Sequence, residues 1–387
     1  MAPRRRIPIL LVGALAALAL ASVTLASLSL AKAGGARART AKGPEPIVGL
    51  IDGTSNWGDQ TMGRRMSQVA SRSGAKWLGE RFDWDKIEPQ PGVFNFAHYD
   101  HFMLVAARKH EHVMGILYSA PSWASPASNV IPTDPSAYAD YVAAVARRYG
   151  PGGTFWAAHP TLAGYAITTF DLWHEPYYDV GNGGQYDPGR FARLVKAAVS
   201  AGRAANPSAK FLLAAEMQGE SVGSRYVWWV DALYQAVPDL NNYFDGVSVH
   251  PYGHDIKHRS PAIVGHAYTG YDQMRRIEII RQQFIHHGAG AKPFWATEVG
   301  WPTCRHVSNR CVNTRGQVRS LRTLVRYART IWSGYVRAVF VYYYNDQRGP
   351  RSNPENDYGL TYVNHRAKPA LRVFRGYARK ASATSGW

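Results

Sequence analysis

Cysteine is almost absent from this chain of 387 residues, which contains only Cys304 and Cys311. Neither a Cys-x-x-Cys pair nor a His-Glu-x-x-His sequence is present, so a zinc site would have to draw on other ligands. No metal ion and no cofactor is therefore expected. The closeness of the two cysteines instead predicts one disulfide that closes a short loop in an exported protein.

Acidic residues are also scarce. Asp and Glu total 27 against 45 Lys and Arg, which gives a formal net charge of +18. A positive field favours an anionic partner, such as an anionic polysaccharide or a cell surface. Nucleic acid is the other common polyanion, but the basic residues are spread along expected helices and no nucleic-acid-binding module is recognisable. We expect no nucleic-acid partner, and a monomer.

A long apolar run lies at the N-terminus. Three arginines precede residues 7–30, which carry no charge, and small residues follow at the positions typical of signal cleavage. This pattern predicts a secretory signal peptide over residues 1–33. An uncleaved membrane anchor formed by residues 7–30 is the alternative, and either leaves the rest of the chain outside the cytoplasm. Residues 34–46 have the composition of a flexible linker.

From residue 47 onward, short apolar runs alternate eight times with amphipathic segments. Such alternation is typical of βα units around a parallel sheet. The expected strands cover residues 47–51, 76–82, 113–118, a run ending at 175, 211–215, 246–249, a run ending at 298, and 338–344. This α/β pattern predicts one (β/α)8 barrel domain, a TIM barrel, over residues 47–383. A doubly wound open sheet is the alternative.

Two glutamates close expected strands among tryptophans. Glu175 ends the apolar run in residues 170–176, and Glu298 holds the equivalent place in residues 295–302. The carboxyl ends of parallel barrel strands meet on one face, so the two carboxylates should face each other across its mouth. Cleavage of a glycosidic bond needs such a pair: one acid protonates the leaving oxygen, and the other attacks the sugar carbon or activates water. The sequence therefore predicts a glycoside hydrolase.

Polar and aromatic side chains follow the other expected strands. Aromatic rings with polar tips suit amphipathic ligands such as sugars, although core packing explains many of the 12 Trp and 23 Tyr residues. Glu216 is interpreted as a supporting polar group and Glu88 as a loop contact. The predicted carbohydrate-binding residues are Arg81, Trp123, His174, His250, Tyr252, Trp301, Tyr343 and Asn345.

The motifs resemble those of the clan A glycoside hydrolases, whose catalytic barrels include families 5 and 39. The resemblance covers about residues 49–371. In that clan the acid/base glutamate ends strand four in a Trp-Asn-Glu-Pro type sequence, matched here by residues 173–176, and the nucleophile ends strand seven, matched by residues 297–301. Supporting matches are Arg81 with residues 84–92, residues 250–252, and three segments similar to family 39, namely 343–346, 358–360 and 368–370. The resemblance implies a retaining β-glycosidase with Glu175 as acid/base and Glu298 as nucleophile.

His174 departs from the clan pattern, because Asn usually precedes the acid/base and bonds the sugar hydroxyl next to the reacting carbon. Imidazole can donate that bond when suitably protonated, but it is larger and titrates. His174 should therefore alter sugar preference and pH profile rather than reaction class. The acid Glu175 is expected to have a raised pKa, with Arg81 and Tyr252 holding Glu298 ionised.

Two other functions compete. Residues 219–223 fit the Gly-x-Ser-x-Gly elbow of serine hydrolases around Ser221, and Asp346 and His365 follow in the right order. That reading leaves both glutamate motifs unexplained. A non-catalytic sugar-binding barrel is the other alternative, because the usual Asn is missing.

Overall fold

The computed structural model describes residues 45–51, 59–178, 182–183, 185–222, 225–253, 262–264, 267–269, 274–304, 310–350, 352–381 and 386–387. The predicted signal peptide, the alternative anchor and most of the predicted linker lie outside these residues. The linker's last two residues, Glu45 and Pro46, are described, and Glu45 forms an ion pair of 2.6 Å with Arg329. Within the described part of the chain, no helix is long and apolar enough to cross a membrane.

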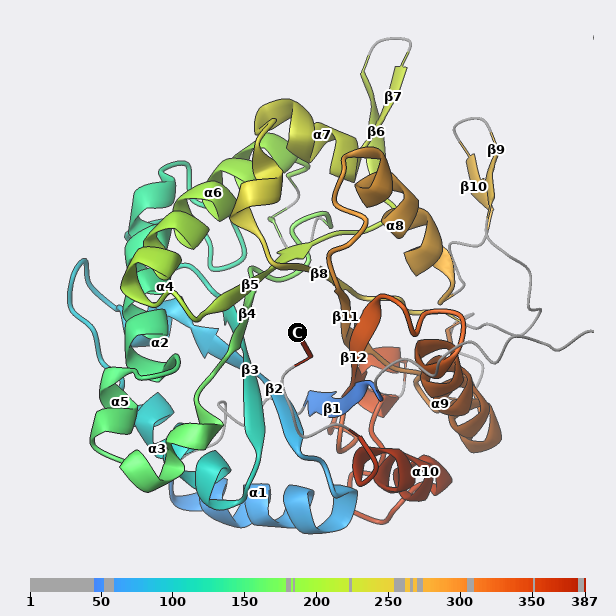
Figure 1. The fold of residues 1–387 in the computed structure, drawn as a ribbon. Coiled ribbons are helices and arrows are strands. Elements are labelled where there is room, and N and C mark those ends of the chain that lie inside the picture. Colours follow the sequence, from blue (N-terminus) through green and yellow to red (C-terminus); the bar gives the residue numbers. More distant parts are fainter. Residues whose placement is uncertain are drawn as a thin grey trace, which may run out of the picture. The chain divides into compact units, whose positions relative to one another are not determined.

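Eight parallel strands close into a barrel in the order β1-β12-β11-β8-β5-β4-β3-β2 (Figure 1). The predicted TIM barrel is thus confirmed, and the open-sheet alternative is wrong. The strands are β1 (Ile47–Ile51), β2 (Trp77–Asp83), β3 (His112–Tyr118), β4 (Thr169–Leu172), β5 (Lys210–Ala214), β8 (Gly246–Val249), β11 (Phe294–Val299) and β12 (Val336–Tyr342). Their near-continuous burial explains why they read as apolar runs, since parallel strands are covered on both faces.

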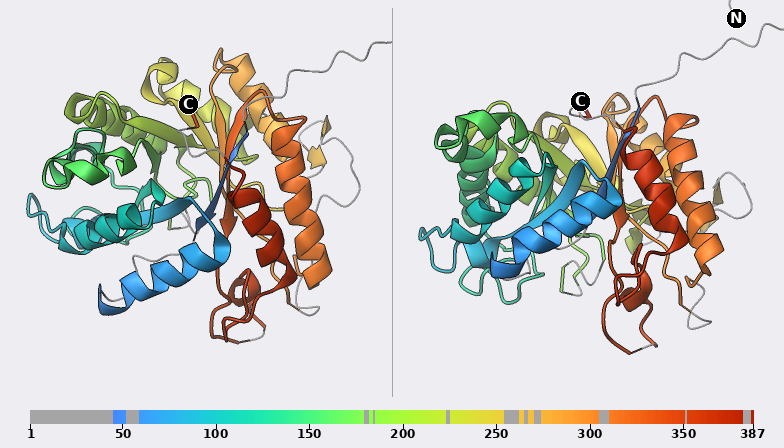
Figure 2. Two further views of the ribbon diagram at one scale, coloured as in Figure 1. Left: turned by 60° about the horizontal axis from the view of Figure 1, so that its bottom comes forward. Right: turned by 90° about the horizontal axis from the view of Figure 1, so that it is seen from below.

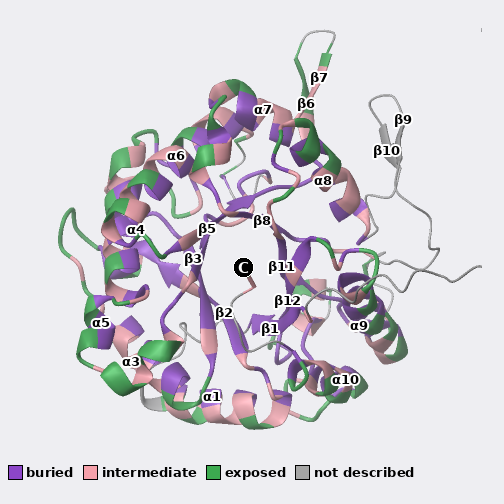
Figure 3. Ribbon diagram, in the orientation of Figure 1, coloured by how far each residue is buried: buried purple, intermediate pink, exposed green. Residues whose placement is uncertain are grey.

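Helices surround the barrel, with buried residues facing the strands and exposed residues facing outward (Figure 3). The main helices are α1 (Asp59–Ser73), α3 (Ala97–Arg108), α4 (Pro135–Tyr149), α6 (Pro188–Ala205), α7 (Trp229–Ala236), α8 (Arg276–His286), α9 (Thr314–Arg329) and α10 (Pro369–Ala378). Helix α6 shows why a helix begins at a particular residue. The Asp187 carboxylate accepts a hydrogen bond from the backbone N–H of Arg190, and Pro188 occupies the first turn, where its missing N–H costs no hydrogen bond.

The barrel interior is filled by side chains and is not a pore. Its apolar cluster includes Trp77, Met114, Trp295 and Phe340. Gly49 is required by this packing, because a Cβ there would lie 2.3 Å from the ring of Phe340. Several tryptophans are therefore core residues, which confirms the packing interpretation for part of the aromatic content.

The C-terminal tryptophan packs against the amino end of the barrel (Figures 1 and 2). The indole N–H of Trp387 donates a 2.8 Å hydrogen bond to the Thr169 hydroxyl at the start of β4, and its ring lies 5.7 Å from that of Trp295. The barrel domain therefore extends beyond the predicted limit of residue 383. A single aromatic after a helix carries no periodic signal, so the sequence pattern did not indicate this contact.

The serine hydrolase alternative is wrong. Ser221 is exposed on β6 (Gly219–Val222), which pairs antiparallel with β7 (Arg225–Trp228), whereas a nucleophile elbow requires a turn from a strand into a helix. Asp346 is engaged elsewhere, because the Lys368 ammonium lies 2.7 Å from its carboxylate. The predicted disulfide is confirmed between Cys304 and Cys311, whose Cα atoms are 5.1 Å apart.

Candidate active site

The turn after β4 has an unusual backbone. Trp173 and Glu175 have φ angles of 67° and 46°, in the left-handed region that non-glycine residues rarely occupy. Trp173 is buried edge-on against the rings of Tyr118 and Tyr138, 5.2 Å and 5.5 Å away, which holds the turn in place. Strain of this kind persists only where surrounding packing enforces it, and it concentrates at functional sites. The turn places His174 and Glu175 just beyond the strand.

Glu175 is paired with a histidine. Its Oε1 atom lies 2.7 Å from Nδ1 of His250, which follows β8, and the two side chains are 17% and 7% exposed. Burial would raise the pKa of Glu175, but the hydrogen bond and charge of His250 outweigh it and lower that pKa. Burial would lower the pKa of His250, but the charges of Glu298 and Glu175 raise it. The expected raised pKa of Glu175 is thus wrong, because the hydrogen bond and charge of His250 lower the pKa of that carboxyl.

Glu298 lies near the end of β11, and its Oε1 atom accepts a 2.5 Å hydrogen bond from the Tyr252 hydroxyl. One nitrogen each of His174 and His250 and one carboxylate oxygen of Glu298 lie within 4.8 Å of one another. Since His250 contacts Glu175 directly, it links the two glutamates across the barrel mouth. Both carboxylates therefore reach one cluster of side chains from β4 and β11, as the strand-end motifs predicted.

Gly300, two residues after Glu298, lets this part of the chain approach β12. A Cβ on Gly300 would lie 2.2 Å from the carbonyl oxygen of Tyr342, so any other residue would push the two segments apart. The glycine in the second glutamate motif therefore has a packing role that supports the position of Glu298.

His174 lies beside both carboxylates. Its Nε2 atom is 4.0 Å from Oε2 of Glu175, and its ring centre is 5.3 Å from that of His250. Burial lowers the pKa of His174, against the opposing charges of the glutamates. A neutral ring at neutral pH can donate one hydrogen bond and accept another, which is how an asparagine amide would serve here.

His174, His250 and Glu298 are the described residues that come closest to a metal site. Donor atoms on a tetrahedral zinc ion would lie about 3.3 Å apart, given bonds of about 2.0 Å. The observed separations of up to 4.8 Å are wider, and Nδ1 of His250 is already hydrogen-bonded to Glu175. These groups would have to move together to bind zinc, and no metal is needed for the chemistry proposed below.

A buried ion pair fixes the segment that carries His250 and Tyr252. The guanidinium of Arg276, at the start of α8, lies 2.7 Å from Oε2 of Glu216, and both side chains are almost fully buried. The same guanidinium donates hydrogen bonds to the backbone carbonyls of His250 and Tyr252. Glu216 thus has the supporting role predicted for it. Its partner Arg276 gave no sequence signal, because it lies in an ordinary amphipathic helix.

Replacing Glu216 by Gln is expected to lower the free energy of unfolding by about 3–5 kcal/mol, because it leaves the Arg276 charge buried without its carboxylate. Urea unfolding followed by fluorescence measures this change. Asp239→Asn is the matched control, since Asp239 pairs with Lys196 at 3.1 Å on the exposed surface, where solvent screens the pair, and its loss should change the free energy of unfolding little. Equal losses in the two variants would contradict a structural role for the Glu216 pair.

Several predicted sugar-binding residues have other partners. Arg81 pairs with Asp83 at 2.8 Å and lies 4.8 Å above the Tyr118 ring, so its ion pair is not with Glu298 as expected. Trp123 is half-buried, and its indole N–H donates to the Glu88 carbonyl. Glu88 itself is the loop contact expected, because it accepts hydrogen bonds from the indole of Trp84 and the backbone of Gly92.

Trp301, Tyr343 and Asn345 are part of the scaffold around the mouth. Trp301 is 2% exposed and donates from its indole to the Gly253 carbonyl, so it acts as a wall rather than as an open stacking platform. Tyr343 is buried. Asn345 donates to the Asp346 carbonyl and accepts from the Thr361 hydroxyl, which occupies both ends of its amide. Tyr343 and Asn345 thus have internal contacts, and their sugar contacts stay a prediction.

Tyr342 and Tyr358 lie on the Glu298 side of the site, and neither is among the eight predicted carbohydrate-binding residues. Their rings lie 5.5 Å apart, and the Tyr358 ring lies 5.8 Å from that of Tyr252. The pKa of Tyr342 is raised chiefly by burial and next by the charge of Glu298. Strand alternation was the available signal: Phe340 points into the barrel, so Tyr342 shares its face whereas Tyr343 does not.

Comparisons with known proteins agree with this architecture. Solved structures with similar folds include a family 39 glycoside hydrolase from the gut symbiont Bacteroides cellulosilyticus WH2, with a TM-score of 0.62 and 18% identity over 87% of this chain and 64% of that one. A monomeric beta-xylosidase from Caulobacter crescentus CB15 has a TM-score of 0.58 and 17% identity over 86% of this chain and 69% of that one. Xylanase 10B from Thermotoga maritima has a TM-score of 0.56 and 14% identity over 87% and 95% of the two chains.

The chain thus spans 64% of the length of the Bacteroides structure. Neither a protein-family model nor a curated protein sequence matches it. The TM-scores show a shared barrel, and at identities below 25% they show the fold alone, so the resemblance found in the sequence is confirmed for the fold.

Proposed function

We propose that the protein hydrolyses O-glycosidic bonds of a β-linked oligosaccharide or polysaccharide by a retaining double displacement. Glu175 acts as the acid/base and Glu298 as the nucleophile. One observation supports the proposal: Glu175 is hydrogen-bonded to His250, and a carboxylate oxygen of Glu298, distant in sequence, lies within 4.8 Å of a nitrogen of the same ring. Two carboxylates that share one sugar-sized site are the minimum that this reaction requires.

The first chemical step forms a bond between a Glu298 oxygen and the sugar carbon while the glycosidic bond breaks. The leaving oxygen takes a proton from Glu175, which receives it from Nδ1 of His250 along their 2.7 Å hydrogen bond. The charge of Glu298 is one reason why the pKa of His250 is raised, and that charge disappears as the new bond forms. Nucleophilic attack therefore drives the proton from His250 towards Glu175 when the leaving group needs it.

The second step reverses these roles. Glu175, now ionised, removes a proton from water, and the water oxygen attacks the sugar carbon and releases Glu298. The proton returns to the pair formed by Glu175 and His250. The Tyr252 hydroxyl donates to Glu298 throughout and stabilises its charge before attack and after release. We propose that His174, beside both carboxylates, bonds the sugar hydroxyl next to the reacting carbon.

Replacing His250 by Asn is expected to shift the basic limb of the kcat/KM profile to lower pH by about one unit or more. The pair of Glu175 and His250 keeps its proton until pH exceeds the raised pKa of His250. In the variant the proton resides on Glu175 alone, and a carboxylic acid releases it at lower pH. The profile for a nitrophenyl β-glycoside measures the shift, and an unchanged basic limb would contradict shared protonation.

A panel of aryl β-glycosides and β-linked polysaccharides, with product stereochemistry followed by NMR, tests the proposed reaction. A retaining hydrolase releases phenol and first forms the β-configured sugar. A non-catalytic sugar-binding barrel would bind a glycan but release no phenol.

We also propose that the protein acts outside the cytoplasm, which the N-terminal apolar run and the Cys304–Cys311 disulfide support.

A further inference from the structure

Helix α9 carries a row of arginines that the proposed reaction does not use. Its positive residues recur at intervals of four and three, so all of them fall within an arc of about 80° at 100° per residue. They are Arg315, Arg319, Arg322, Arg326 and Arg329. The first four are exposed, and the opposite face of the helix, with Leu321 and Leu324, is buried against the barrel.

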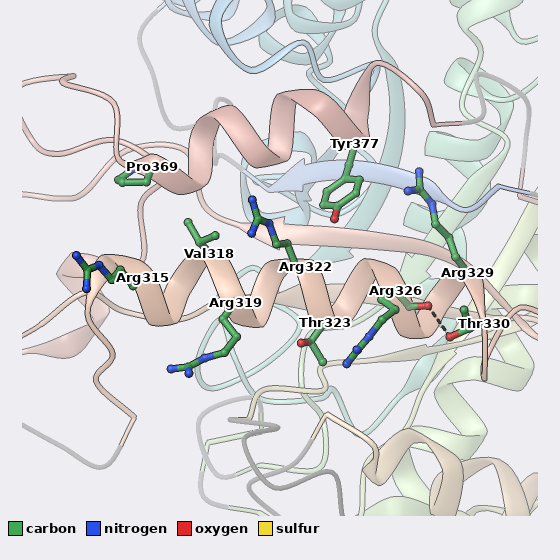
Figure 4. Close-up of a pocket in the computed structure, with 10 residues that line it drawn as sticks. All are labelled: Arg315, Val318, Arg319, Arg322, Thr323, Arg326, Arg329, Thr330, Pro369 and Tyr377. Atoms are coloured by element: carbon green, nitrogen blue, oxygen red, sulfur yellow. Dashed lines mark hydrogen bonds between the residues drawn. The ribbon is translucent and has the colours of Figure 1, made fainter.

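Helices α9 and α10 lie side by side in both views of Figure 2. Along the arginine row the surface is hollowed, and Figure 4 shows Arg322 extending from α9 toward α10, whereas Arg319 and Arg326 extend from the other side of α9. This hollow of about 850 Å³ is lined by the five arginines, with Pro369 and Tyr377 contributed by α10 (Figure 4). A second hollow of about 310 Å³ shares Arg322, Arg329 and Tyr377 and adds Arg372 and Lys380. We refer to the residues that line both hollows as the α9–α10 groove. None of these described lining residues is acidic.

The charge of the groove is largely uncompensated. Arg329 pairs with Glu45 at 2.6 Å. Among the described residues, the structure assigns no carboxylate partner to the exposed arginines of α9 (Arg315, Arg319, Arg322 and Arg326). Like charges one turn apart destabilise a helix by a few tenths of a kcal/mol per pair. A surface that keeps them close together, without its own counter-charges, concentrates positive potential along one line and attracts an extended polyanion.

The geometry points to a carboxylated or sulfated polysaccharide as the occupant. We propose that the α9–α10 groove binds such a chain through its guanidinium groups, which form paired hydrogen bonds with planar or tetrahedral oxyanions. Successive arginines rise by about 4.5–6 Å along the helix, a spacing comparable with one sugar ring. The choice of a glycan over other polyanions rests on the proposed function.

Other polyanions fit the groove less well. Insertion into a membrane surface requires an exposed apolar helix face, but the apolar face of α9 is buried. Single-stranded nucleic acid is typically held by several stacking aromatic rings, and Tyr377 is the aromatic residue that lines the groove.

The groove begins on the same side of the barrel as the mouth. Helix α9 follows β11, which bears Glu298, so its first residues lie at the carboxyl end of the strands. Arg315 is therefore the end of the row nearest the catalytic side, and Arg329 is the far end. A polysaccharide bound along the groove would be held beside the mouth, which increases the local concentration of chain segments there.

Binding is tested in the Glu298→Gln background, so that no glycan is consumed. The groove variant combines Arg315→Gln, Arg319→Gln, Arg322→Gln and Arg326→Gln. A matched control removes the same four charges from exposed positions on α1, α3, α4 and α6, namely Arg64→Gln, Arg108→Gln, Arg147→Gln and Arg193→Gln. Calorimetry at 0.15 M salt uses heparin and alginate oligosaccharides, with a neutral glucan, single-stranded DNA and phosphatidylserine vesicles as comparison ligands.

We expect the groove variant to bind the anionic oligosaccharides at least tenfold more weakly than the parent and the control variant to bind within threefold of it. Equal weakening in both variants, or none in the groove variant, would overturn the groove as a site. Tighter binding of DNA or vesicles than of either glycan would overturn the assigned occupant. Failure of the proposed hydrolase activity would leave these binding results unchanged, because they require no turnover.

In proteins with Glu298 intact, the groove variant should also keep its kcat on a small neutral aryl β-glycoside within twofold. Its kcat/KM on an anionic polysaccharide should fall, provided that the polysaccharide is cleaved at all. A loss on the small substrate as well would show that the substitutions damage the barrel, and circular dichroism would identify that outcome independently.

Discussion

Glu298→Gln should reduce kcat on every glycoside that the protein cleaves by a factor on the order of 10⁴ or more. Glutamine keeps the shape of the side chain and can still accept a hydrogen bond from Tyr252, but its neutral amide cannot form the covalent bond to the sugar carbon. Steady-state rates with an aryl β-glycoside measure the loss. Because the size and packing are preserved, the unfolding midpoint should change little.

The smaller variant Glu298→Ala gives a second test of the role. It leaves space beside the sugar carbon in which added azide can attack, and the product of that reaction should have inverted configuration. Azide rescue with this stereochemistry identifies Glu298 as the nucleophile. Residual activity above about one part in a hundred in both variants would exclude a covalent role for this residue.

Glu175→Gln should produce a loss that depends on the leaving group. Removal of a general acid costs about 10²–10⁴ in rate, and the loss is largest when the departing oxygen most needs a proton. A dinitrophenyl glycoside, whose leaving group is acidic, should still form the intermediate rapidly, whereas an alkyl glycoside or an oligosaccharide should react on the order of 10³-fold more slowly. Pre-steady-state kinetics should show a burst of dinitrophenol, because the second step also lacks its base.

A uniform loss across leaving groups would contradict the acid/base assignment of Glu175. The matched control is Glu88→Gln, a buried glutamate that contacts Trp84 and Gly92 in the loop after β2 rather than the site. Its rates should show no dependence on the leaving group beyond that of the parent. A loss of rate on all glycosides in the Glu298 variant, together with a loss that depends on the leaving group in the Glu175 variant, would assign the two roles with one set of substrates.

His174 occupies the position where the clan A pattern usually has asparagine, and its surroundings show what this difference changes. Its ring lies beside both glutamates and 5.3 Å from the ring of His250, so Glu175, the proposed acid/base, lies beside two titratable rings instead of one. Burial lowers the pKa of His174, whereas carboxylate charge raises that of His250. The surroundings therefore shift the pKa values of the two histidines in opposite directions, although they are the same type of residue.

The sequence determined the barrel and the placement of its chemistry. Short apolar runs such as residues 47–51 and 246–249 became strands because burial on both faces leaves no other pattern for a parallel strand. Glu175 and Glu298 could be assigned to one face because the carboxyl ends of all barrel strands meet there. The disulfide could also be predicted from the sequence, since the chain has only two cysteines and they are seven positions apart.

Tertiary structure alone decided which side chains are partners. His250 is hydrogen-bonded to Glu175, whereas Arg81 pairs with Asp83. Arg276 fixes the segment after β8, and Asn345 is hydrogen-bonded to Asp346 and Thr361. Trp387, from the far end of the chain, packs against the amino end of the barrel. Periodicity reports which face a residue occupies, but hydrogen-bond partners and pKa values depend on distances of a few ångströms between elements far apart in sequence, which only the packed barrel defines.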